Sequence, residues 1–91
     1  MMPFMENIIR EKLIRALAPQ ALEIIDESLS HAGHTGARSE GNTHFHIKLT
    51  AQAFGSLSRL ERHRVVYEIL KAELNGHIHA LSLDLRSPQE R

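Results

Sequence analysis

Seven histidines and no cysteine set the chemistry available to this 91-residue chain. Without a thiol the chain has no disulfide, no cysteine nucleophile and no thiolate metal site of its own. Imidazoles bind transition metals and titrate near neutral pH, so the histidines are the first candidates for a site. We expect about two of them to be ligands and the rest to be surface or hydrogen-bonded residues. The seven are His31, His34, His44, His46, His63, His77 and His79.

The sharpest candidate is His79, because it opens a predicted strand. Strand alternation places it on the same face as Leu81, Leu83 and Leu85, which we expect to be the buried face. A buried imidazole needs a hydrogen-bond partner or a position at the open end of the sheet. The residues leave two interpretations open. His79 is either a half-buried histidine with a hydrogen-bond partner, which spacing alone favours, or a metal ligand held by a rigid strand.

Each of the other candidate histidines can be an ordinary surface residue or a functional one. His31 and His34 lie in a long loop with three glycines, where solvated side chains are the usual outcome. His44 and His46 share one face of a strand, about 7 Å apart. That spacing suits a metal chelate, but it is more often a polar outer face that points away from the core. His63 stands between two arginines, where a surface or capping role is expected.

Two features raise the question of nucleic-acid binding. Gly33-His34-Thr35-Gly36 has the GxxG spacing of KH domains, but it falls between two predicted strands, and we interpret it as a flexible loop. The main basic cluster is Arg59, Arg62 and Arg64, which two nearby glutamates offset. This predicts weak, salt-sensitive phosphate binding at most. Helix-surface ion pairing is the alternative role for Arg62 and Arg64.

The bulk composition excludes several classes of protein. The formal net charge is zero, so the whole-protein field does not favour nucleic acid or an anionic membrane. No apolar run approaches the roughly 20 residues of a membrane span. The N-terminus lacks the basic and apolar regions of a secretory signal, which predicts a cytoplasmic protein. There is no recognisable nucleophile–base pair, phosphate loop or paired-carboxylate motif, so we expect no enzymatic activity.

Hydrophobic periodicity predicts five elements around one small core. A capping box of Ser58 and Glu61 favours a helix start, and Asn75-Gly76 is typical of a helix end. Pro19 is expected to end the first helix. The predicted elements are a helix at 4–17, a strand at 22–28, a strand at 44–50, a helical region from about 57 to 76 and a strand from 78 to about 85.

The order of these elements predicts an α+β fold. The first two strands are expected to pair antiparallel, and a right-handed crossover through the helical region makes the last two parallel. The result is a two-layer domain with a three-stranded mixed sheet and helices on one face. The element order is αββαβ, or αββααβ if the helical region breaks near Arg59–Arg62.

Two segments carry a family resemblance. They are Arg62-His63-Arg64-Val65-Val66-Tyr67 and Ile78-His79-Ala80-Leu81-Ser82-Leu83, with Phe54-Gly55-Ser56 upstream and Asn75-Gly76 between them. In this order and spacing the chain closely resembles the BolA family, from about residue 6 to residue 88. The resemblance implies a single BolA-like domain over residues 1–91, with its core at about 5–88. It also implies a fold related to the class II KH architecture.

The resemblance further implies a function in iron–sulfur trafficking or iron regulation. BolA-like proteins pair with monothiol glutaredoxins and share a [2Fe–2S] cluster, and the histidine that matches His79 is a ligand. Glu27-Ser28 followed by His31-Ala32 matches members with a second histidine ligand, so His31 is expected to be that ligand and His34 is the alternative. The glutaredoxin cysteine and glutathione would supply the thiolates. Two imidazoles can replace two thiolates on one iron, as in Rieske centres.

Two other functions stay open. Some BolA relatives are described as transcriptional regulators, which implies DNA binding through Arg59, Arg62 and Arg64. The other alternative is a homodimer that holds zinc through surface histidines. The cluster hypothesis predicts that the isolated protein holds no iron–sulfur cluster, because it has no cysteine to anchor one.

Overall fold

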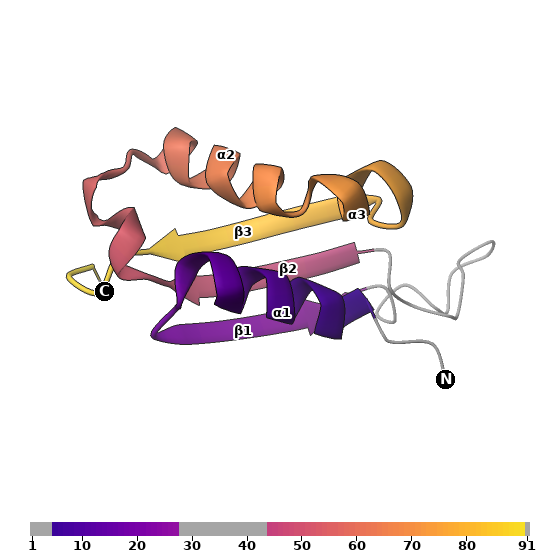
Figure 1. Ribbon diagram of the computed structural model, residues 1–91, viewed down its shortest axis with the longest axis horizontal. Coiled ribbons are helices and arrows are strands. Elements are labelled where there is room, and N and C mark those ends of the chain that lie inside the picture. Colours follow the sequence, from indigo (N-terminus) through magenta and orange to yellow (C-terminus); the bar gives the residue numbers. More distant parts are fainter. Residues whose placement is uncertain (1–4, 28–43, 91) are drawn as a thin grey trace.

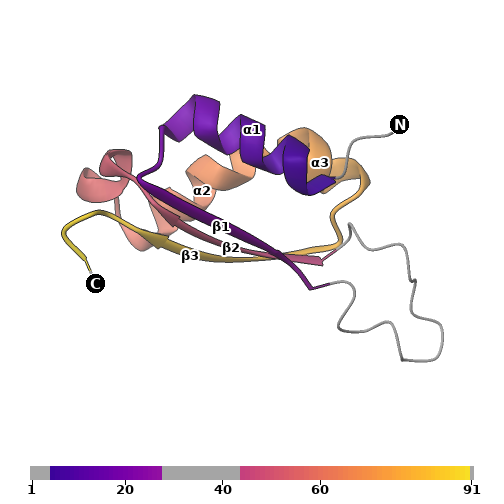
Figure 2. The ribbon, with the colours of Figure 1, turned by 90° about the horizontal axis from the view of Figure 1, so that it is seen from below.

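The computed structural model describes residues 5–27 and 44–90, which form one sheet with helices on one of its faces (Figures 1 and 2). The sheet order is β1-β2-β3, with β1 and β2 antiparallel and β2 and β3 parallel. The α+β class and the mixed three-stranded sheet are therefore confirmed. The elements are α1 (Met5–Leu17), β1 (Ala21–Asp26), β2 (His44–Thr50), the 3-10 helix η2 (Gln52–Ser56), α2 (Arg59–Ile69), α3 (Lys71–Gly76) and β3 (Ala80–Arg86).

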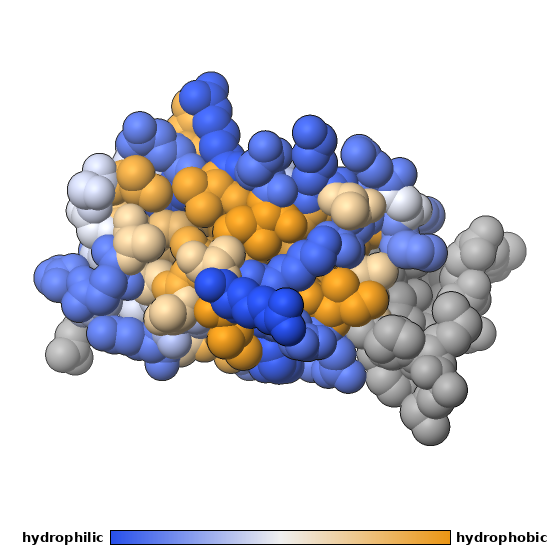
Figure 3. All heavy atoms as spheres, viewed as in Figure 1, coloured by the Kyte–Doolittle hydropathy of each residue, from blue (hydrophilic) through white to orange (hydrophobic). Residues whose placement is uncertain are grey.

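The central strand β2 fixes the core, because its side chains alternate as predicted. Phe45, Ile47 and Leu49 are between 0 and 2% exposed and pack under the helices. The helices α1 and α2 contribute residues of the same buried cluster, among them Leu13 and Val66. Figure 3 shows apolar side chains gathered between α1 and α2 and polar side chains around them. Among the described helices, none combines the length and the hydropathy that a bilayer crossing requires.

The first helix ends as the sequence predicts. Ala18 follows α1 with a φ of 44°, the left-handed conformation that commonly closes a helix. Its amide donates to the carbonyl of Ile14 at 3.0 Å, and Pro19, which has no amide proton, follows. A salt bridge of 2.7 Å between Lys12 and the buried Glu73 then joins α1 to α3.

The helical region has two helices, but the predicted position of the break is wrong. Arg59–Arg62 is the first turn of α2, which the predicted capping box starts: Glu61 N–H donates to Ser58 Oγ at 3.2 Å, and Ser58 N–H donates to Glu61 Oε1 at 2.8 Å. The break falls at Leu70, with φ −100° and ψ 18°. Leu70 is fully buried, and the bend there lets α3 place Glu73 against α1.

Two strand boundaries also differ from prediction. The first strand is one residue earlier at its start and ends at Asp26, and Ser28 lies outside the described residues. The last strand begins at Ala80 rather than at Ile78. The amide of Ile78 donates to the carbonyl of Glu73 at 3.0 Å, so it closes the end of α3 instead of joining the sheet.

Candidate functional site

His79 lies immediately before β3, at the end of the sheet where α3 turns into that strand (Figure 1). The side chain is exposed, so the prediction that it is half-buried on the face of Leu81 is wrong. The physical reason is the local backbone: Ile78 inserts into the core at 4% exposure, and the next residue points outward before the strand ladder begins. Exposure leaves the imidazole accessible to a metal or a partner.

Among the described residues, His79 has an aromatic neighbour in His44, the first residue of β2. The two ring centres are 6.0 Å apart, and the ring planes cross at 68°. Parallel pairing of β2 and β3 produces this neighbourhood, because His44 is opposite Ala80 in the register. Strand alternation alone instead suggests a pair of His44 and His46. The predicted parallel topology was the signal for the observed pair, since it brings the starts of both strands to one edge.

His46 lies on the same face of β2 as His44 but has its own contact, with a residue of β3. Its Nδ1 lies 2.6 Å from Ser82 Oγ, a residue opposite it on β3. His46 therefore has Ser82 as its neighbour, whereas His44 lies beside His79. Beside His44 a hollow of about 170 Å³ opens, which Glu27, Ala80 and Ser82 line in part. We define the histidine end as His44, His79 and this hollow.

The other two predicted ligands, His31 and His34, lie outside the described residues, as does the Gly33–Gly36 motif. Their role stays a prediction. The described residues on either side of that segment do meet at the histidine end, where Glu27 N–H donates to the carbonyl of His44 at 2.7 Å. Within residues 5–27 and 44–90, no group of three or more His, Asp or Glu side chains could hold a metal ion.

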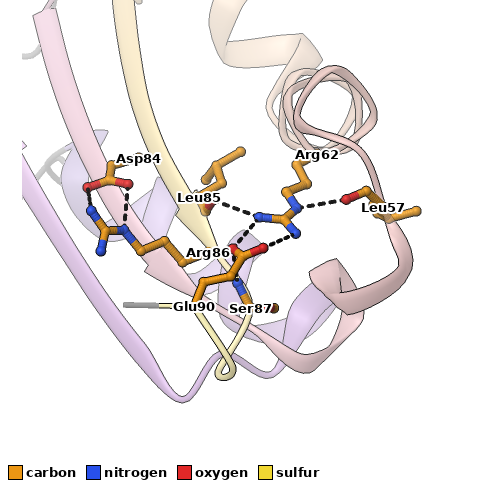
Figure 4. Close-up of polar contacts among 7 residues, drawn as sticks. All are labelled: Leu57, Arg62, Asp84, Leu85, Arg86, Ser87 and Glu90. Atoms are coloured by element: carbon orange, nitrogen blue, oxygen red, sulfur yellow. Dashed lines mark hydrogen bonds and ion pairs between the residues drawn. The ribbon is translucent and has the colours of Figure 1, made fainter.

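At the opposite end of β3, Arg62 lies in a dense set of polar contacts (Figure 4). Its Nε donates to the carbonyl of Leu57 at 3.0 Å, and Nη1 donates to the carbonyl of Leu85 at 3.1 Å. Nη1 and Nη2 also donate to the two carboxylate oxygens of Glu90, at 2.7 and 2.8 Å. The guanidinium carbon lies 5.8 Å from the ring centre of Phe54. We call this set the Arg62 clamp.

The clamp changes the electrostatics of both charged groups. Hydrogen bonding to Glu90 raises the pKa of Arg62. The same bonds, with a further bond from the amide of Ser87, lower the pKa of Glu90 to about 2. Arg62 is 8% exposed, so its side chain is committed to the fold rather than to a ligand. The predicted surface set of three arginines keeps only Arg59 and Arg64 exposed.

The fold and these residues define a small α+β domain with histidines at one sheet end, and comparison with known proteins gives its family. The family model for BolA-like proteins matches residues 13–90. The chain belongs to the BolA family. It is 42% identical over 86 residues to SufE-like protein 1, chloroplastic/mitochondrial, of Arabidopsis thaliana, a match that covers 90% of this chain and 23% of the relative. It is 41% identical over 85 residues to BolA-like protein 1 of Homo sapiens, covering 93% and 59%.

Solved structures agree with the fold. The BolA domain of SufE1 from Arabidopsis thaliana aligns with a TM-score of 0.85 at 38% identity and full coverage of both chains. The solution structure of BolA1 from Mus musculus aligns with a TM-score of 0.80 at 35% identity, covering 97% of this chain and 68% of that one. The chain spans 23% and 52% of the length of two curated Arabidopsis relatives, so these carry additional sequence.

Proposed function

We propose that this chain is a non-enzymatic BolA-like protein that pairs with a monothiol glutaredoxin and co-ligates a [2Fe–2S] cluster for iron–sulfur trafficking or iron regulation. The observation that carries the proposal is the position of His79. It is an exposed imidazole that follows a buried anchor residue, Ile78, at the end of the sheet. Such a side chain can reach a partner while the backbone behind it stays fixed.

The donor set of the chain fits half of a shared cluster. Iron–sulfur clusters usually take four thiolates, and this sequence has no cysteine. Two of the cluster's four protein ligands can be histidines, both on the same iron, as in Rieske centres. We assign His79 as one of these ligands, with His31 as the second and His34 as its alternative. The glutaredoxin cysteine and bound glutathione supply the thiolates. The cluster itself would supply a redox-active, transferable iron centre.

The division of ligands between two molecules has a functional consequence. Replacing thiolates by imidazoles raises the reduction potential of a cluster, and imidazoles lose their metal when they are protonated. A cluster held partly in this way is easier to release than one held by four thiolates of a single chain. This suits transfer or sensing better than permanent storage.

DNA binding has less support than cluster binding as a function of this chain. It was expected to use three arginines of the helical region, but Arg62 is bound to Glu90 and two backbone carbonyls. Arg59 and Arg64 remain, and each phosphate contact requires its own cation. Arg59 and Arg64 alone support weak, salt-sensitive binding to DNA phosphates that does not distinguish base sequences.

The direct experiment mixes the tag-free protein with a monothiol glutaredoxin, glutathione, iron and sulfide under anaerobic conditions. We expect a one-to-one heterodimer with one [2Fe–2S] cluster, measured by native mass spectrometry and visible circular dichroism. The same reconstitution without glutaredoxin is expected to leave this protein free of cluster. A cluster bound in stoichiometric amounts by the isolated monomer, or no heterodimer with any monothiol glutaredoxin tested, would reject the proposal.

A further inference from the structure

We propose that His44 and His79 together form a site for one divalent transition-metal ion in the isolated protein. The ring centres lie 6.0 Å apart. Two imidazoles that bind one metal ion place their ring centres about 4.5–6.5 Å apart, because each metal–nitrogen bond is about 2.0–2.1 Å. The observed separation lies within that range, so it is compatible with both rings binding one ion.

The backbone holds the two histidines at this separation. His44 and Ala80 are partners in the β2–β3 register, and His79 comes directly before Ala80. Each histidine also has a buried neighbour in sequence: Phe45 is 1% exposed and Ile78 is 4% exposed. Strand pairing and core packing therefore fix both Cα positions before any metal arrives, which reduces the entropy that binding must overcome.

The chemistry of the pair selects a class of ion. Neutral imidazole nitrogen favours borderline ions such as Zn²⁺, Ni²⁺ and Cu²⁺ over hard ions such as Mg²⁺ and Ca²⁺. With two protein ligands the remaining positions are filled by water, and the exposure of His79 leaves room for them. Binding is therefore reversible and weaker than at a closed structural site with four protein ligands.

The site goes beyond the proposed function, because it needs neither a glutaredoxin nor a cluster. It uses His44, to which no cluster role is assigned, and it shares His79 with the proposed cluster ligands. An ion at the histidine end and the cluster-bearing partner therefore compete for His79. Metal binding by the free protein and cluster binding by the heterodimer can each succeed or fail independently of the other.

The test is a Zn²⁺ titration of the tag-free isolated protein, followed by the imidazole nitrogen resonances of uniformly ¹⁵N-labelled protein and by calorimetry. We expect one saturable site at which the His44 and His79 resonances shift together. His44→Ala and His79→Ala should each weaken binding about tenfold or more, because chelation by the second ring is lost. Two matched controls, His46→Ala and His77→Ala, should bind within about twofold of the wild type, since chelation at the pair stays intact.

The resonance shifts of the wild-type protein test the proposal even if a variant fails to fold. Shifts confined to other histidines would overturn it. So would wild-type affinity in His44→Ala, or the loss of binding in a His31→Ala/His34→Ala double variant that keeps His44 and His79. The absence of stoichiometric Zn²⁺ binding would overturn it as well.

Discussion

A candidate histidine and a candidate arginine lie near opposite ends of β3, and the fold uses them in opposite ways. At the start of the strand, the ring of His79 is exposed and lies beside His44. At the other end, Arg62 is buried and bonded to Glu90 and to two backbone carbonyls. At the first end the imidazole is exposed, whereas at the other end the guanidinium is already bonded within the protein.

Residue type alone therefore does not identify a site. Arg62 occupies the same kind of helical stretch as Arg59 and Arg64, yet it is the one that is withdrawn from the surface. Its partner Glu90 is 28 residues away in sequence. A functional assignment to an arginine or a histidine therefore depends on whether a distant residue already satisfies it, as Glu90 satisfies Arg62.

Loss of the Arg62 clamp should lower the stability of the fold more than any other substitution discussed below. Arg62→Ala removes a bidentate ion pair and leaves the carbonyls of Leu57 and Leu85 without this donor. We expect the melting temperature to fall by about 10 °C, because Arg62 is 8% exposed and its loss removes four hydrogen bonds, to Leu57, Leu85 and both carboxylate oxygens of the exposed Glu90. Arg64→Ala, an exposed arginine of the same helix, is the control and should change it by less than about 3 °C. Equal effects of the two substitutions would contradict the structural role of Arg62.

The pH dependence of stability provides a second test of the Arg62–Glu90 ion pair. The folded-state pKa of Glu90 is lowered from its ordinary 4.5 to about 2, so the ion pair stabilises the fold above pH 4.5. That contribution is lost as the pH falls from 4.5 toward 2. The melting temperature of the wild type should exceed that of Glu90→Gln at pH 7, and the gap should shrink across this window. A gap that is constant from pH 7 to pH 2 would mean that Glu90 does not pair with Arg62 in solution.

Two serine substitutions, one near each end of β3, should have smaller effects on the unfolding free energy. Ser58 caps α2 near the clamp, and Ser82 bonds His46 on the exposed sheet face near the histidine end. Ser58→Ala should cost about 1 kcal/mol of unfolding free energy, as the loss of a helix cap usually does. Ser82→Ala should cost less than about 0.5 kcal/mol, because the bond is exposed. Urea denaturation measures both, and the reverse order would contradict the comparison.

Much of the fold could be predicted from the sequence because local patterns determine it. Alternation of Phe45, Ile47 and Leu49 defines β2, and Ser58 with Glu61 defines the start of α2. The crossover rule gives the parallel pairing of β2 and β3. The break at Leu70 was not predictable in the same way, because it depends on how α3 meets α1 through Glu73 and Lys12.

The candidate site was less predictable because it depends on contacts between distant residues. Strand periodicity placed His79 on the buried face, but the end of α3 displaces it from the ladder through the Ile78 amide. The His44 neighbour follows from register, which a single sequence fixes only approximately. Arg62 was assigned to a surface because nothing in its local sequence indicates Glu90.

The assignment of His79 as a cluster ligand is tested by the visible circular dichroism of the glutaredoxin heterodimer made with His79→Ala, recorded beside the melting temperature of the free variant. His79 is exposed, so the melting temperature should stay within about 3 °C of the wild type. The cluster spectrum should change and the cluster should be lost faster, since one iron loses a ligand, whereas His77→Ala should leave both unchanged. An unchanged spectrum and cluster lifetime in His79→Ala would contradict the assignment of the histidine end as the ligand-bearing end of this domain.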